Sequence, residues 1–216
     1  MNTVSAIIFL VCLASDQTSH LIQQGMERFR QGRVAESLAQ FDRAIEVDQR
    51  VKPYLWQRGI SQYCLGDFAG GRQQFEIHRK VNPNDVENAA WHYLCVVKTD
   101  GQDVARQSLI PIKTEFDRRA PMKEIYEYLA GTASEDDVLR AAEQADTPLS
   151  RMYAHLYLGL CEDVEGNTDE AMKHLRIAST ENLKDSYMQD VAKVILGQRL
   201  NIVKPETELN QPGEEN

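Results

Sequence analysis

The chain has 216 residues, of which 42% are hydrophobic, so it is long enough to bury a sizeable core as one domain. Its formal net charge is −9, and no cluster of Lys and Arg is present. Nucleic-acid-binding surfaces draw most of their affinity from clustered basic side chains, so we expect no nucleic-acid partner.

The first fifteen residues differ from everything after them. Val4 to Leu13 is a ten-residue apolar run, too short to cross a bilayer as a helix, and Cys12-Leu13-Ala14 has the small-x-small pattern of a signal-peptidase site. We predict that residues 1–15 are a signal peptide and that the protein is exported to the periplasm or cell envelope.

Two alternatives for this segment stay open. It is either a retained helix that packs on the first repeat of a cytoplasmic protein, or a lipid attachment signal at Cys12. The second alternative conflicts with bulky Val11, which stands where lipoprotein processing favours a small residue. We expect membrane contact only if the N-terminus is retained or lipidated.

A pattern of two glycines seven residues apart, followed nine residues later by a large apolar residue, occurs three times. Its members are Gly25, Gly32 and Phe41; Gly59, Gly66 and Phe75; and Gly159, Gly166 and Leu175. We expect the first glycine of each set to let one helix pack closely on the next. The second glycine would end the first helix in a left-handed conformation.

These positions divide the chain into a repeat domain over residues 18–200. Clear repeats are predicted over 18–51, 52–85 and 152–183, with a degenerate section over 86–148. Lys52-Pro53 is predicted to open a helix, since proline is harmless in the first helical turn.

Within the degenerate section, helices are predicted over residues 86–98, from Pro121 to Leu129, and over 135–145 with Ser134 to Asp137 as the cap. After the last clear repeat, Ser186 to Leu200 has the spacing of an amphipathic closing helix. Residues 201–216, rich in glutamate and proline, are predicted to be a disordered acidic tail.

The 34-residue interval from Gly25 to Gly59, with this internal spacing, resembles the tetratricopeptide repeat. The resemblance implies an all-α fold, a right-handed α-α superhelix of helix pairs. The middle section would be degenerate, and a C-terminal helix would cap the array.

The order of several segments also resembles bacterial envelope lipoproteins of the NlpI type. The segments are Leu55 to Tyr63, Asn82 to Asp85, Ala90 to Leu94, Glu124 to Gly131 and Tyr157 to Gly159. That family is exported, helical and often dimeric, and it holds peptidoglycan hydrolases and a processing protease as an adaptor. The resemblance implies a non-catalytic interaction scaffold, with a homodimer left open. The alternative is an intracellular tetratricopeptide assembly or co-chaperone-like module without export.

In such an array the concave face is lined by the first helix of each unit, and we expect it to bind a peptide or helix of a protein partner. Counting helical turns from the glycines gives the candidate groove residues, which are Met26, Phe29, Arg30, Trp56, Ile60, Tyr63 and Leu94. The alternative reading is that these apolar and aromatic residues are core.

We predict that the protein is not an enzyme and needs no cofactor or metal. The five histidines lack metal-ligand spacing, and no metalloprotease, nucleophile-elbow or phosphate-loop motif occurs. Cys64, Cys95 and Cys161 are widely spaced and are interpreted as core thiols.

Overall fold

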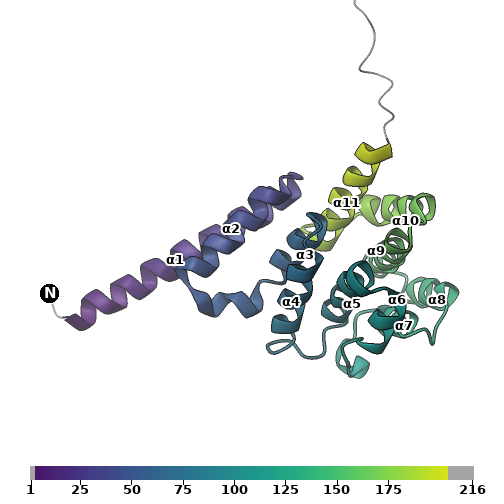
Figure 1. Cartoon of the computed structure of the whole chain (residues 1–216), viewed down its shortest axis with the longest axis horizontal. Coiled ribbons are helices and arrows are strands. Elements are labelled where there is room, and N and C mark those ends of the chain that lie inside the picture. The colour runs from purple at the N-terminus through teal and green to yellow at the C-terminus, as the bar shows by residue number, and fades with distance from the viewer. Residues whose placement is uncertain (1–2, 204–216) are drawn as a thin grey trace, which may run out of the picture.

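The structure is a computed structural model that describes residues 3–203, with side chains described from residue 16 to residue 201. Every regular element in this range is helical, and successive helices pack against one another along the chain (Figure 1). The predicted all-α superhelical array of helix pairs is confirmed.

The first pair consists of α1 (Thr3–Arg30) and the antiparallel α2 (Val34–Val47). A Cβ atom added at Gly25 would lie 2.7 Å from Cε1 of Phe41, closer than two carbon atoms normally approach. Gly32 has a φ angle of +74°, which glycine adopts without strain, and it turns the chain from α1 into α2. Gly25 therefore allows α1 to pack closely on α2, and Gly32 allows the turn between the two helices.

The second pair is preceded by a 3-10 helix, η1 (Gln49–Tyr54), and consists of α3 (Trp56–Cys64) and α4 (Phe68–His78). The prediction that Lys52-Pro53 opens the α-helix is wrong, because Pro53 lies inside η1. The Asp48 side chain accepts a hydrogen bond from the Arg50 N–H at 3.0 Å, which starts a tight turn before Pro53. The α-helix therefore begins only at Trp56.

The middle section contains one central helix and several short ones. The central helix, α5 (Val86–Asp100), is buried along most of its length, because α4, α6, α7 and α9 all pack on it. Short helices follow it: α6 (Gln102–Gln107), the 3-10 helix η2 (Thr114–Phe116), α7 (Met122–Leu129) and α8 (Glu135–Ala145). The α8 helix has the predicted bounds, and Ser134 and Asp137 form a capping box at its start.

The last pair consists of α9 (Pro148–Glu165) and α10 (Thr168–Thr180). A Cβ at Gly159 would lie 3.2 Å from the Ala171 carbonyl oxygen and from Cγ of Leu175, so α9 and α10 are in close contact there. Gly166 turns the chain with a φ angle of +88°.

The chain closes with α11 (Tyr187–Val203), which packs on α10, α1 and α9 (Figure 1). The acidic tail was predicted over residues 201–216, but residues 201–203 continue this helix. Residues 204–216 lie outside the described residues. Residues 3–15 belong to the backbone of α1. The signal peptide and the lipidation of Cys12 stay predictions.

Candidate functional site

The inner surface formed by the first helices of the pairs is partly covered by the chain's own last helix. The ring of Tyr187 on α11 stacks on Phe29 at a centroid distance of 5.3 Å and meets Trp56 edge-on at 5.4 Å. Further along α11, Gln198 donates a hydrogen bond to the Cys64 carbonyl, and Arg199 forms an ion pair with Asp163 of α9. The helix α11 therefore lies along α1, α3 and α9.

This arrangement decides how much of the predicted groove is accessible. Four of its seven residues are buried core residues: Phe29, Ile60, Tyr63 and Leu94. A partner would reach Phe29 only after α11 had left its place. The sequence therefore located a real cluster of residues, but most of it faces other parts of this chain.

The remaining three groove residues present some surface. Met26 is half-buried and lies 4.0 Å from Nε2 of Gln57. Arg30 is exposed and pairs with Asp190 of α11 at 3.0 Å. Trp56 is half-buried and lines a cavity. The partner-binding role of the seven residues stays a prediction.

The cavity lies between α3, α4 and the start of α5 and has a volume of about 150 Å³. Its lining combines aromatic rings with polar side chains. Its lining residues are Trp56, Phe75, Asp85, Glu87, Asn88, Trp91 and Arg119. A cavity of this size admits a group as large as benzene, so it is wide enough for one side chain.

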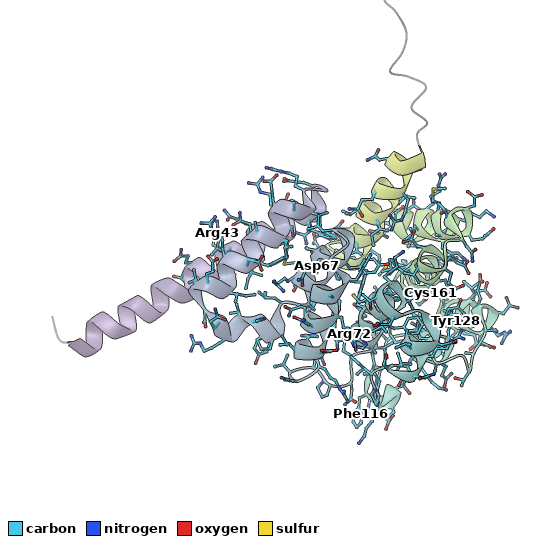
Figure 2. All side chains as sticks on the ribbon, viewed as in Figure 1. Arg43, Asp67, Arg72, Phe116, Tyr128 and Cys161 are labelled. Carbon is cyan, nitrogen blue, oxygen red and sulfur yellow. The ribbon has the colours of Figure 1, made fainter. Side chains whose placement is uncertain are left out.

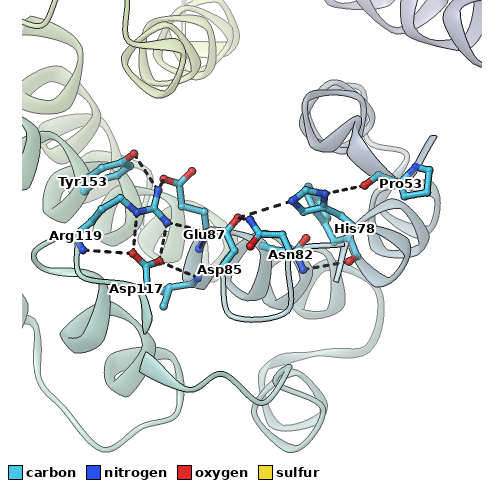
Figure 3. Close-up of polar contacts among 11 residues, drawn as sticks. Pro53, His78, Asn82, Asp85, Glu87, Asp117, Arg119 and Tyr153 are labelled. Carbon is cyan, nitrogen blue, oxygen red and sulfur yellow. Dashed lines mark hydrogen bonds and ion pairs between the residues drawn. The ribbon is translucent and has the colours of Figure 1, made fainter. Parts of the chain in front are cut away.

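The polar side of the cavity is organised by Arg119, which lies in the irregular segment between η2 and α7 (Figure 3). Its Nε and Nη2 donate to the two oxygens of Asp117 at 2.8 and 2.6 Å, in a bidentate pair. Nη2 also donates to Asp85 at 2.8 Å, and Nη1 donates to Glu87 and, at 3.3 Å, to the Tyr153 hydroxyl. These contacts use all five N–H groups of the guanidinium.

Burial and charge perturb the titration of this network. Burial raises the pKa of Glu87 to about 7, and Asp85 adds to the rise while the Arg119 charge opposes it. Burial also raises the pKa of Asp117, but hydrogen bonds from Arg119 outweigh it, so the net shift is downward. The Glu87 carboxyl therefore changes its charge near neutral pH.

Within the described part of the chain, two buried polar atoms of the lining residues have no hydrogen-bond partner. Asn88 is 2% exposed, and its Nδ2 donates to the Phe75 carbonyl, but its Oδ1 accepts nothing. Trp91 is 1% exposed, and its Nε1 donates to nothing. Buried polar groups are nearly always paired with protein or water, so these two atoms are exceptions among the residues that line the cavity.

Most of this site was missed from the sequence, which located Trp56 alone. Asp85 follows Pro83 and precedes α5, and so has the position of a helix cap; its side chain does accept from the Glu87 N–H at 3.2 Å. Arg119 lies 34 residues after Asp85 in a stretch without repeat spacing, and no sequence pattern signals their contact.

Other candidate groups lie apart from the cavity. His155 and His174 face each other with their Nδ1 atoms 2.9 Å apart, and His174 Nε2 lies 3.3 Å from Glu135. Within the described part of the chain no group of three or more His, Cys, Asp or Glu could hold a metal ion. Phe116, 65% exposed, projects from the edge of the array (Figure 2).

Between residues 3 and 203, no helix has both the length and the apolar character needed to span a membrane. Comparison of the sequence with protein-family models and with curated proteins gives no match.

Proposed function

We propose that this protein is a non-catalytic interaction scaffold whose helix pairs are tetratricopeptide units, and that it binds a segment of a partner protein on its inner face. The observation that carries the proposal is the cavity beside Trp56, where Asn88 Oδ1 and Trp91 Nε1 have no partner among the described residues. Interaction hot spots are often aromatic side chains next to a pocket that a partner residue fills.

The position of α11 limits where the partner would lie. Tyr187 covers Phe29 and one edge of Trp56, so the inner face near α1 is already occupied. The rim of the cavity, with Trp56 and Arg119, lies beyond the part that Tyr187 covers. A bound segment would therefore run past the starts of α3 and α5 rather than along the whole array.

Features of the side chains favour a scaffold over an enzyme. Burial raises the pKa of the thiols of Cys64, Cys95 and Cys161, the first of them to about 12, so they are poor nucleophiles at neutral pH. The guanidinium of Arg119 is fully used by its protein partners and offers no donor to a reacting oxyanion.

The proposal is tested by site-specific photo-crosslinking in native cells. A photo-reactive residue at Arg118, an exposed position beside Arg119, should give discrete protein adducts. The same residue at Arg43, exposed on α2, serves as the matched control (Figure 2). Equal adduct patterns from the two positions, or none from Arg118, would rule out the inner-face scaffold.

We also propose export to the cell envelope, based on the apolar run from Val4 to Leu13 and the resemblance to NlpI-type envelope adaptors. The mature chain is expected to begin near Ser15 or Asp16. Intact mass measurement of protein from its native cells tests this. An intact Met1 would contradict export by cleavage, and a diacylated Cys12 would indicate a lipoprotein instead.

A further inference from the structure

The hydrogen-bonding capacity of the cavity excludes an anion as its occupant. Arg119 is the cation among the lining residues, and each of its five N–H groups already donates to Asp85, Glu87, Asp117 or Tyr153. A carboxylate or phosphate would find no free donor on it. Such a ligand would also be placed next to three carboxyl groups, which repel it.

The polar side chains at the cavity have more unused hydrogen-bond acceptors than donors. Asp85, Glu87 and Asp117 surround a single guanidinium, so the ionised cluster carries more negative than positive charge. Each carboxylate accepts about four hydrogen bonds. Asp117 already accepts four, one from the Val86 N–H and three from Arg119. Asp85 and Glu87 accept fewer and keep spare capacity. Asn88 Oδ1 adds a neutral acceptor that is buried and that no described residue uses. The polar wall therefore requires donors and a positive charge.

The rest of the cavity lining is aromatic. Trp56, Phe75 and Trp91 line the cavity, and the rings of Phe75 and Trp91 are stacked with an interplanar angle of 18°. The faces of such rings attract cations, tryptophan most strongly, and they also pack against methylene groups. At about 150 Å³ the cavity accommodates a chain of a few methylenes ending in a charged head.

We propose that this cavity receives a lysine side chain from the bound partner segment, with its methylenes between the aromatic rings and its ammonium group against Glu87 and Asn88. The Nε1 of Trp91 would donate to a carbonyl of the same segment. This inference rests on the proposed scaffold function and names the residue type that the scaffold recognises.

The two tryptophans of the chain make the cavity directly observable, because both line it. Titration with N-acetyl-lysine methylamide should change the intrinsic fluorescence with a saturable curve, whereas the neutral norleucine analogue should not. Binding should weaken as salt is raised. A cavity that gives no saturable change with the lysine analogue would refute the proposal.

Two variants test the chemistry. Glu87→Gln should reduce the affinity about tenfold at pH 8, the effect expected from losing one charge-assisted hydrogen bond. Glu143→Gln, at an exposed position on α8, is the matched control and should bind normally. If Glu87→Gln fails to fold by circular dichroism, Trp56→Leu tests the aromatic wall instead, with Trp91 as the remaining reporter. Undiminished binding by the folded variant would contradict the assignment.

Three further ligands distinguish a lysine side chain from other possible occupants of the cavity. Equal binding of the norleucine analogue would mean an apolar pocket, binding of the N-acetyl-glutamate analogue would mean an anion site, and much tighter binding of cadaverine would mean a free polyamine site. Each of these results overturns the lysine assignment. Crosslinks from Arg118 that persist when the lysine analogue does not bind would refute only this inference. Lysine binding without such crosslinks would refute only the scaffold.

Discussion

Single residues set how closely the helices of each pair approach. Gly25 and Gly59 occupy equivalent places on α1 and α3, and at each of them a Cβ would lie 2.7 Å from the phenylalanine ring of the next helix. Gly197 on α11 is also helical, but a Cβ there would have no neighbour within 4 Å. Glycine therefore has a packing role on α1 and α3 but none at position 197 on α11.

Replacing Gly59 by alanine should lower the free energy of unfolding by about 1–3 kcal/mol, because the new methyl group overpacks against Phe75. Gly197→Ala is the matched control and should be neutral or stabilising by up to about 1 kcal/mol, since alanine favours the helix. Urea unfolding followed by circular dichroism measures both. Similar values for the two variants would show that the close contact at Gly59 does not limit packing.

The titration of Glu87 should make stability depend on pH. Its pKa is raised from 4.5 to about 7 by burial, so the folded state holds this proton more tightly than the unfolded chain does. That stabilisation is complete below about pH 4.5 and is lost as the pH rises through 7. We expect wild type to lose on the order of 2 kcal/mol relative to Glu87→Gln between pH 5 and pH 8.

The comparison isolates Glu87 because other groups that titrate in this range are common to both proteins. Arg119 stays paired with Asp85 and Asp117 in the variant, so the substitution does not leave a buried charge without a partner. Denaturant unfolding at each pH gives the difference. A constant difference from pH 5 to pH 8 would mean that Glu87 does not titrate near neutrality.

Residues with a local role could be predicted from the sequence, and residues with a distant partner could not. The turn glycines Gly32 and Gly66 are identified by a fixed spacing within their own helix pair, and both have positive φ angles. Asn88 and Arg119 carry no comparable signal. Their role depends on contacts between α5 and an irregular segment, and the repeat pattern says nothing about that segment.

At the scale of elements, helix boundaries follow the local capping groups. Ser134 and Asp137 specify the start of α8, which is why its bounds were predictable. At Pro53 the preceding Asp48 imposes a 3-10 helix, so proline does not mark an α-helix start there. The amphipathic pattern predicted α11, but not the surface that α11 covers, because amphipathicity gives a face and not its partner.

An ion pair with a buried carboxylate joins α11 to α9. Asp163 has a side chain only 5% exposed and pairs with Arg199, whose pKa is raised chiefly by that hydrogen bond. Arg199→Met would leave the carboxylate buried without a partner and should cost about 3–5 kcal/mol. Adding Asp163→Asn should recover part of that loss. Thermal or urea unfolding of both variants tests this, and an equal loss in the double variant would show that packing rather than charge holds α11.

At the scale of the whole molecule, α11 joins units that are far apart in the array. In a simple repeat protein each unit contacts only its neighbours, and stability is nearly a sum of local terms. Here α11 contacts Phe29 and Arg30 of the first pair, Cys64 of the second and Asp163 of the last. Arg30 and Asp190 lie 160 positions apart, and such a contact has no counterpart in the 34-residue pattern. The closed arrangement was therefore not predictable from the repeats.

This closure should make the first helix pair depend on the last helix. Tyr187→Ala removes the contacts of the Tyr187 ring with Phe29 and Trp56. Because a buried aromatic side chain is lost, the free energy of unfolding should fall by about 3–5 kcal/mol. The amide hydrogens of α1 and α2 should then exchange faster, whereas those of α9 and α10 should stay closer to their wild-type protection. Native-state hydrogen exchange with mass spectrometry resolves the two regions.

Tyr54→Ala, at a tyrosine 62% exposed on η1, is the control and should leave both regions unchanged. A uniform increase over all four helices would mean that the molecule opens as a single unit, whereas unchanged exchange in α1 and α2 would mean that α11 does not hold the first pair.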